Sequence, residues 1–134
     1  MDMMPHIVTL YNKYLAGNAE KWKRTVLRGV YWDSSKGRTI RKNGISADNG
    51  LVIIIPFSVA ADGDYIKPKE FASLTDKAGK WTIASGDMVV LGDIGYEIER
   101  STKELQKFDD LLTISTVDTR DYGGGMAHWE VTGK

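Results

Sequence analysis

The sequence contains no cysteine, and this absence excludes several kinds of site. Without thiolates the chain can form neither a disulfide nor a zinc–thiolate centre, and it has no thiol nucleophile. Its two histidines, His6 and His128, lie at opposite ends of the chain and stand in no metal-ligand spacing. His128 alternates with Trp129, which favours a residue on a strand face. We therefore expect no metal ion, no cofactor and no catalytic residue.

An excess of charge is also lacking, since 18 Lys and Arg residues balance 18 Asp and Glu residues. This balance gives no general attraction to nucleic acid or to an anionic membrane, and it leaves little self-repulsion to oppose assembly. The longest strongly apolar run, Leu51–Phe57, is far too short to span a bilayer. Residues Met1–His6 lack the basic and then apolar character of a signal peptide. These features predict a soluble protein made in the cytoplasm, with no membrane partner.

Sequence motifs of catalysis are missing as well. The acidic residues Asp62, Asp64, Asp87 and Asp93 lie beside glycines without calcium-loop spacing, and such carboxylates are usually turn formers. No serine lies in a G-x-S-x-G motif, and no phosphate-binding loop is present. Gly123–Gly125 is not followed by a helical pattern, which favours a hairpin loop over an anion site. We expect a protein that is not an enzyme.

The sequence does have the alternation typical of β-strands, interrupted by glycine-containing turns. This pattern predicts a mainly β fold: a small β-barrel or sandwich of about 6–8 short strands, in a single domain over residues 1–134. The last two strands are expected to form the hairpin that closes the barrel. The predicted strands are Ile7–Tyr14, Trp22–Trp32, Leu51–Phe57, Trp81–Ser85, Met88–Leu91, Tyr96–Glu99, Thr113–Val117 and Met126–Val131.

Local signals refine this expectation. Leu51–Phe57 is apolar throughout, which predicts a strand buried on both faces. Gly29 predicts a bulge or bend, and Gly86–Asp87 predicts a hairpin between its flanking strands. Pro68 favours an extended connection over Tyr65–Phe71.

One helix is well marked. Ser101 begins the sequence S-T-K-E, which is a capping box. It predicts one short α-helix at about 102–110, covering one end of the barrel.

The segment Asp33–Gly50 differs from the rest because turn-forming residues dominate it. It is predicted to be a long inserted loop, at about 33–50, of a length that often carries function. Basic and aromatic residues in and beside it are the candidates for contact with a partner or with DNA in a channel. These candidates are Trp32, Lys36, Arg38, Arg41 and Lys42.

Three interpretations of this basic region stay open. Its cations interleave with Trp22, Tyr31 and Trp32, whose rings can stack on the bases of a single-stranded nucleic acid. An ordinary solvated strand face with a charged loop is favoured by the neutral total charge. In the third interpretation the loop engages a protein, with arginine and aromatic residues as anchors.

Nearly the whole chain resembles a set of small uncharacterised proteins of tailed phages and prophages of Gram-positive bacteria. The resemblance implies a structural component between head and tail: a head–tail connector, a head-closure protein or a tail-completion protein. Head-closure proteins of this kind are small β-barrels with a long inserted loop, and they form rings. The segments that carry the resemblance are Arg24–Trp32, Leu51–Phe57, Tyr65–Phe71, Asp76–Ile83, Ser85–Asp87, Thr113–Asp118 and His128–Glu130.

The leading hypothesis is therefore a non-enzymatic virion morphogenesis protein at the head–tail junction, assembling as a ring through loop and strand interfaces. Its partners would be portal or connector proteins and tail proteins, with non-specific contact to packaged DNA. It would be made in the bacterial cytoplasm and reside in the virion. The alternative is an OB-like module that binds single-stranded nucleic acid. A small enzyme is the third and least supported hypothesis.

Overall fold

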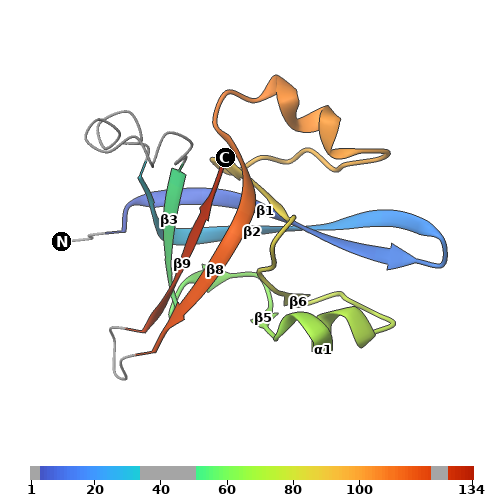
Figure 1. Cartoon of the computed structure of the whole chain (residues 1–134), viewed down its shortest axis with the longest axis horizontal. Coiled ribbons are helices and arrows are strands. Elements are labelled where there is room, and N and C mark those ends of the chain that lie inside the picture. Colours follow the sequence, from blue (N-terminus) through green and yellow to red (C-terminus); the bar gives the residue numbers. More distant parts are fainter. Residues whose placement is uncertain (1–3, 34–50, 122–126) are drawn as a thin grey trace.

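Two long strands dominate the computed structural model, which describes residues 4–33, 51–121 and 127–134 (Figure 1). β1 (His6–Ala16) and β2 (Ala19–Asp33) pair antiparallel along most of their length. Residues 34–50 of the predicted loop and the predicted hairpin loop Gly123–Gly125 lie outside the described residues. The other strands are β3 (Leu51–Pro56), β4 (Ala60–Ala61), β5 (Asp64–Tyr65), β6 (Lys80–Trp81), β7 (Met88–Leu91), β8 (Leu111–Arg120) and β9 (His128–Gly133).

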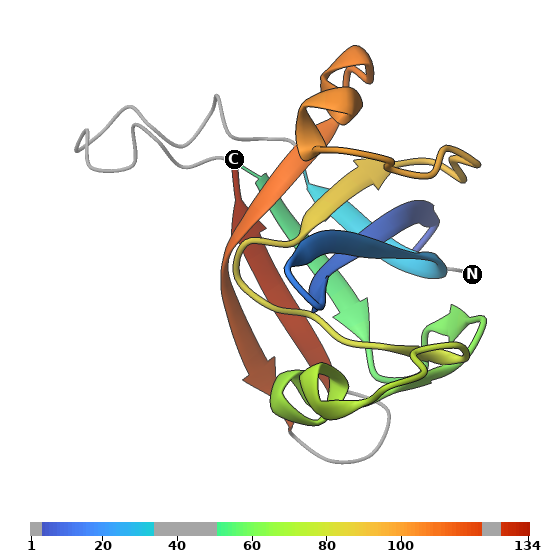
Figure 2. The same ribbon diagram turned by 90° about the vertical axis from the view of Figure 1, so that its right-hand side faces the viewer.

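The larger sheet returns to its own first strand. Its order is β1-β7-β8-β9-β3-β2-β4, and β1 also pairs with β2. These pairings are antiparallel, and Figure 2 shows the strands arranged around a common centre. β5 and β6 form a separate parallel pair. The prediction of a mainly β fold is confirmed, and the sheet is ring-like.

One large apolar cluster fills the interior of this ring-like sheet. Three tryptophans belong to it, and the rings of Trp81 and Trp129 meet edge to face with centroids 5.9 Å apart. Large rings stabilise a small domain because each removes much apolar surface from water. The buried members are Val8, Leu10, Leu27, Val30, Trp32, Leu51, Ile53, Ile55, Trp81, Ile83, Val89, Leu112, Ile114, Trp129 and Val131.

The sequence-based prediction for β3 is only half right. Leu51, Ile53 and Ile55 point into the core, whereas the intervening apolar residues are half-buried. Successive side chains of a strand point to opposite faces, so Val52, Ile54 and Pro56 lie on the outer face of β3. The apolar run therefore leaves an apolar strip on the outside of the ring.

The β1–β2 hairpin extends well beyond the ring as an arm, defined here as residues 12–23 (Figure 1). β1 pairs with β7 only from Val8 to Tyr11, so the arm has no further strand neighbour on that side among the described residues. Gly17 occupies the first turn position with φ +68°, the left-handed conformation that glycine adopts without strain. Nearer the ring, the pairing skips Gly29, which confirms the predicted bulge.

The segment after Pro68 is helical rather than extended, contrary to the prediction. Helix α1 runs over Pro68–Ser73, with Lys67 as its extended N-cap residue. Proline favours an extended conformation at the preceding residue, but it suits the first turn of a helix because its missing N–H has no partner there. Phe71, which is 2 % exposed, anchors the helix to the rest of the molecule.

The predicted helix at about 102–110 forms, but as a 3-10 helix, η3 (Thr102–Lys107). Its capping box is confirmed: the Ser101 side chain accepts from Lys103 N–H, and Glu104 accepts from Ser101 N–H. The predicted strand Tyr96–Glu99 pairs with no strand among the described residues, and the amide of Glu99 donates to the Glu104 side chain instead.

The hairpin predicted around Gly86–Asp87 is wrong. β6 pairs with β5, while β7 pairs with β1 and β8. The Asp87 carboxylate accepts from the amide of Ala84, which draws this segment into a turn rather than a ladder with β7. The C-terminal hairpin of β8 and β9 is confirmed.

Candidate functional site

Most of the candidate contact residues lie outside the described part of the chain. Lys36, Arg38, Arg41 and Lys42 belong to residues 34–50, which connect β2 to β3. These two strands are antiparallel neighbours, with Asp33 opposite Val52. Such neighbours need only about two to five connecting residues, so the sequence inserts far more chain here than the fold requires.

Trp32 is the one candidate that the structure describes, and it does not face outward. Its side chain is 5 % exposed and belongs to the main core cluster. Its backbone N–H donates to His6 Nδ1 at 3.0 Å, which fixes the N-terminus of β1 beside β2. The indole therefore fills the ring, and Trp32 is removed from the set of contact residues.

The basic and aromatic residues of β2 are also separated by the fold. Trp22 is 9 % exposed, and strand alternation sends its neighbours outward. Arg24 Nε lies 2.7 Å from a carboxylate oxygen of Glu97, and Arg28 lies 2.8 Å from Asp93. With Trp22 and Trp32 in the core and these two arginines paired to acids, the described residues do not assemble the stacking surface that nucleic acid requires.

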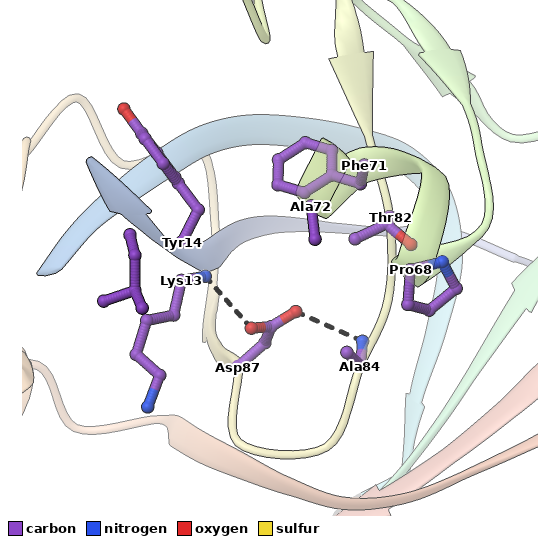
Figure 3. Close-up of a pocket in the computed structure, with 9 residues that line it drawn as sticks. Lys13, Tyr14, Pro68, Phe71, Ala72, Thr82, Ala84 and Asp87 are labelled. Carbon is purple, nitrogen blue, oxygen red and sulfur yellow. Dashed lines mark hydrogen bonds between the residues drawn. The ribbon is translucent and has the colours of Figure 1, made fainter. Parts of the chain in front are cut away.

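A pocket of about 330 Å³ lies between the arm and α1 (Figure 3). The rings of Tyr14 and Phe71 meet edge to face with centroids 6.4 Å apart. The Lys77 ammonium lies 4.8 Å from the centre of the Tyr14 ring and donates to the carbonyl of Leu74 at 2.7 Å. The lining residues are Lys13, Tyr14, Leu15, Pro68, Phe71, Ala72, Thr82, Ala84 and Asp87.

Asp87 is the one acidic residue of this lining, and it is 4 % exposed. Its carboxylate accepts from Asn12 Nδ2 at 2.8 Å and from the amides of Lys13 at 3.0 Å and Ala84 at 3.1 Å. Burial raises the pKa of Asp87, and these three donors lower it in part. Asn12 also exchanges two hydrogen bonds with the backbone of Thr82. The network fastens the base of the arm to residues 64–87, the α1 lobe.

The lining of the pocket does not form an acid–base pair. Asp87 already accepts three hydrogen bonds, and no histidine or second carboxylate is among the lining residues. The three hydrogen bonds hold the Asp87 carboxylate in one position at the base of the arm.

On the other side of the arm, residues 92–110 form the 3-10 lobe around Glu104. This carboxylate accepts from the amides of Glu99 at 3.0 Å, Arg100 at 2.7 Å and Ser101 at 3.0 Å, and from the Tyr96 hydroxyl at 2.8 Å. These hydrogen bonds, with that from Glu99 first, lower the pKa of Glu104 to about 2. Hydrogen bonds to a carboxylate favour its charged form, so Glu104 stays ionised and holds the loop closed.

A second apolar cluster joins the 3-10 lobe to the ring. Tyr11, Trp22, Met88, Val90 and Leu105 form its buried part. The Tyr11 hydroxyl donates to the carbonyl of Tyr96 at 2.8 Å, and burial raises the pKa of Tyr11 to about 12. The phenol therefore remains a donor at every physiological pH.

Sequence reasoning missed an apolar strip on the outer face of β2 and β3. We call Tyr31, Val52, Ile54 and Pro56 the outer strip. Tyr31 is 37 % exposed and lies opposite Ile54 in the antiparallel register. The signal was present, because a strand that is apolar at every position is typical of one covered on both faces.

A charged band borders the outer strip on β8 and β9. Glu130 lies opposite Ile54 on one side and Asp118 on the other. Arg120 lies 3.6 Å from Glu130 and 3.9 Å from Asp118, and His128 Nε2 lies 3.1 Å from Glu130. An apolar centre bordered by mixed charges is the usual anatomy of a protein interface.

Two further observations concern the described residues. Within 4–33, 51–121 and 127–134, no group of three or more histidines and carboxylates is placed to hold a metal ion. No helix in this part of the chain is long and apolar enough to cross a membrane.

The model of a family of unknown function, DUF6751, matches residues 3–134. The chain belongs to this family. The match includes the ring, the arm and both lobes, so all of these elements are part of the DUF6751 unit. No curated protein and no solved structure matches the chain.

Proposed function

We propose that this DUF6751 protein is a non-enzymatic structural component of the head–tail junction of a tailed phage, where copies assemble into a ring. The observation that carries the proposal is the ring-like sheet in which the neighbouring strands β2 and β3 are joined by all of residues 34–50. A rigid β body with one long insertion suits a component that contacts its neighbours through the insertion.

The basic residues of this connection support a contact with acidic protein surfaces or with DNA. Lys36, Arg38, Arg41 and Lys42 lie in it, while the whole chain is neutral. Such cations suit the acidic surface of a portal, connector or tail protein, or the phosphates of DNA passing through the ring. Phosphate contacts carry no sequence information, which fits a channel that any packaged DNA must traverse.

The alternative, an OB-like module for single-stranded nucleic acid, has less support. It relies on Trp22, Tyr31 and Trp32 as stacking residues, and two of these three rings are buried. A titration with single-stranded DNA at two salt concentrations separates the proposals. Tight binding with a steep loss of affinity at the higher salt would favour the alternative.

The main test is deletion of residues 35–48 in a prophage that encodes the chain. We expect the purified variant to melt cooperatively near the wild-type temperature, because β2 and β3 need only a short connection. Electron microscopy of induced lysates should show separate heads and tails. Normal joining of heads to tails would refute the proposed role.

A matched variant keeps the length of the connection and removes its charge. Replacing Arg38, Arg41 and Lys42 with glutamine tests whether joining depends on the cations. The neighbouring genes give an independent check, since a portal gene upstream and a tail-tube gene downstream are expected. A coding sequence outside any phage or prophage region would contradict the proposal.

A further inference from the structure

The outer strip and the tip of the arm are two apolar surfaces at opposite ends of β2. Leu15, beside the tip, is 68 % exposed, the largest value among the exposed large apolar residues of the described chain. Tyr31, in the outer strip, is 37 % exposed. An extended strand rises about 3.3 Å per residue, so the stretch of β2 from Ala19 to Tyr31 spans roughly 40 Å. One copy therefore cannot cover its own strip with its own arm, as Figure 1 shows.

Both surfaces have the properties of protein contacts. The arm projects away from the ring, and Leu15 extends from it beside the rim of the pocket. The outer strip lies on the outward face of β2 and β3, where Tyr31 is exposed and its other members are half-buried, and the charged band runs along its edge. Neighbouring apolar residues on an outward sheet face, bordered by polar ones, mark interaction sites more often than isolated ones do.

The net charges of the two surfaces are of opposite sign. The arm carries Lys13, Lys21 and Lys23 against one acid, Glu20. The charged band carries two acids, Asp118 and Glu130, against Arg120, and the Asp118 side chain is 59 % exposed. A lysine-rich arm is thus suited to the edge of the strip, where complementary charge guides encounter and register.

We propose that the arm tip of one copy of this chain docks on the outer strip of the next copy, with Leu15 packed against Tyr31 and Ile54. The inference rests on the proposed function for the closure of the ring, and it adds the two surfaces that build it. Because the surfaces differ and lie at opposite ends, the contact is heterologous, and repeating it produces a ring or a filament rather than a closed dimer.

The test uses the full chain and two single variants, Leu15→Glu and Ile54→Glu. Each variant buries a carboxylate in the contact, so each alone should be monomeric in sedimentation velocity where the wild type assembles. An equimolar mixture should form a one-to-one dimer and nothing larger. The Ile54→Glu copy still has an intact arm, and the Leu15→Glu copy still has an intact strip, so one contact remains.

A matched control carries the same new charge elsewhere. Gln106→Glu lies on the exposed side of η3, away from both surfaces, and should assemble like the wild type. Circular dichroism melts confirm that each variant folds. Because the chain has no cysteine, Leu15→Cys and Ile54→Cys give a second readout, and a mixture should form the mixed disulfide rather than either homodimer.

Several outcomes overturn the proposal. One is a Leu15→Glu chain that assembles like the wild type. If Ile54→Glu blocks assembly and Leu15→Glu does not, the strip has another occupant, such as residues 34–50 of the next copy. A mixture that stays monomeric excludes a heterologous contact, and a wild type that stays monomeric up to about 1 mM excludes self-docking of useful strength. Each result leaves the head–tail role to be decided separately, by the particle-joining experiment.

Discussion

Asp87 and Glu104 make a natural comparison, because each carboxylate fastens one lobe beside the arm by accepting amide hydrogen bonds. Asp87 holds the α1 lobe with three N–H donors, and Glu104 holds the 3-10 lobe with three amides and the Tyr96 hydroxyl. Their pKa values nevertheless move in opposite directions: that of Asp87 is raised, and that of Glu104 is lowered to about 2.

The difference lies in the surroundings rather than in the donors. Asp87 is 4 % exposed, so the loss of its water shell outweighs the hydrogen bonds that replace it. Glu104 keeps contact with solvent and adds its donors to that hydration. Hydrogen bonds from N–H donors therefore lower the pKa of a carboxylate that stays in contact with water. In the interior the same hydrogen bonds offset only part of the rise in pKa that burial causes.

Removing the buried carboxylate should have the largest effect. Asp87→Ala removes one of the two acceptors of the Asn12 amide and the carboxylate acceptor of the Lys13 and Ala84 N–H groups, and we expect a loss of roughly 3 kcal/mol in unfolding free energy. Urea denaturation measures it. Ser85→Ala, at an exposed neighbour in the same turn, is the control and should stay within about 0.5 kcal/mol. An equal loss of unfolding free energy in Asp87→Ala and Ser85→Ala would contradict the role given to the buried carboxylate.

The two lobes should differ in their sensitivity to acid. Glu104 has a folded pKa of about 2, below the ordinary value of roughly 4.3 in the unfolded chain, so its stabilising contribution is lost as pH falls from about 5 towards 2. Asp87 has a raised folded pKa, so its shift has the opposite sign and favours the folded state as pH falls. Nuclear magnetic resonance at decreasing pH should show the 3-10 lobe loosening before the base of the arm. The reverse order would contradict the assignment.

Neutralising Glu104 without acid should have a smaller and local effect. Glu104→Gln keeps one acceptor oxygen but loses the charge that strengthens each hydrogen bond. We expect faster hydrogen exchange at the amides of Glu99, Arg100 and Ser101, with a loss of stability below that of Asp87→Ala. Gln106→Ala is the matched control on the same helix. Unchanged exchange at these three amides would show that the carboxylate does not hold the loop.

The exposed ion pairs that tie β2 to the 3-10 lobe should matter least. Arg28→Gln breaks a contact whose side chains are 53 % and 48 % exposed, and we expect a change of about 0.5 kcal/mol that disappears in 1 M salt. Thermal melts at two salt concentrations provide the measurement. A loss above about 1.5 kcal/mol that persists in high salt would mean that the pair has a larger structural role than exposed pairs usually have.

Much of the fold follows from local pattern. Alternation located β1, β2, β7 and the C-terminal hairpin, and the S-T-K-E sequence located the helix start at Ser101. Prediction failed where a distant residue decides the outcome. The turn at Gly86–Asp87 looks like a hairpin locally, but Asp87 bonds to Asn12, 75 residues away in sequence.

The candidate site was less predictable than the fold. Lys36, Arg38, Arg41 and Lys42 remain predictions from sequence, while Trp32 proved to be a core residue. Trp32 and the outward Tyr31 are adjacent and both aromatic, so composition does not distinguish them. Their roles depend on which face of β2 turns towards the ring, and that is set by pairing with β1 and β3.

Local sequence was enough to predict the long strands β1 and β2, the bulge at Gly29 and the capped start of η3, because each depends on residues only a few positions apart. Long-range pairing was needed to show that β1 closes the sheet, that the arm extends beyond it, and that β3 leaves an apolar strip on the outer face. The tertiary structure also decided which carboxylate is buried and which stays in water. Strand pairing and burial are contacts between residues far apart in the chain. A local sequence pattern therefore does not show which distant segment a strand will pair with.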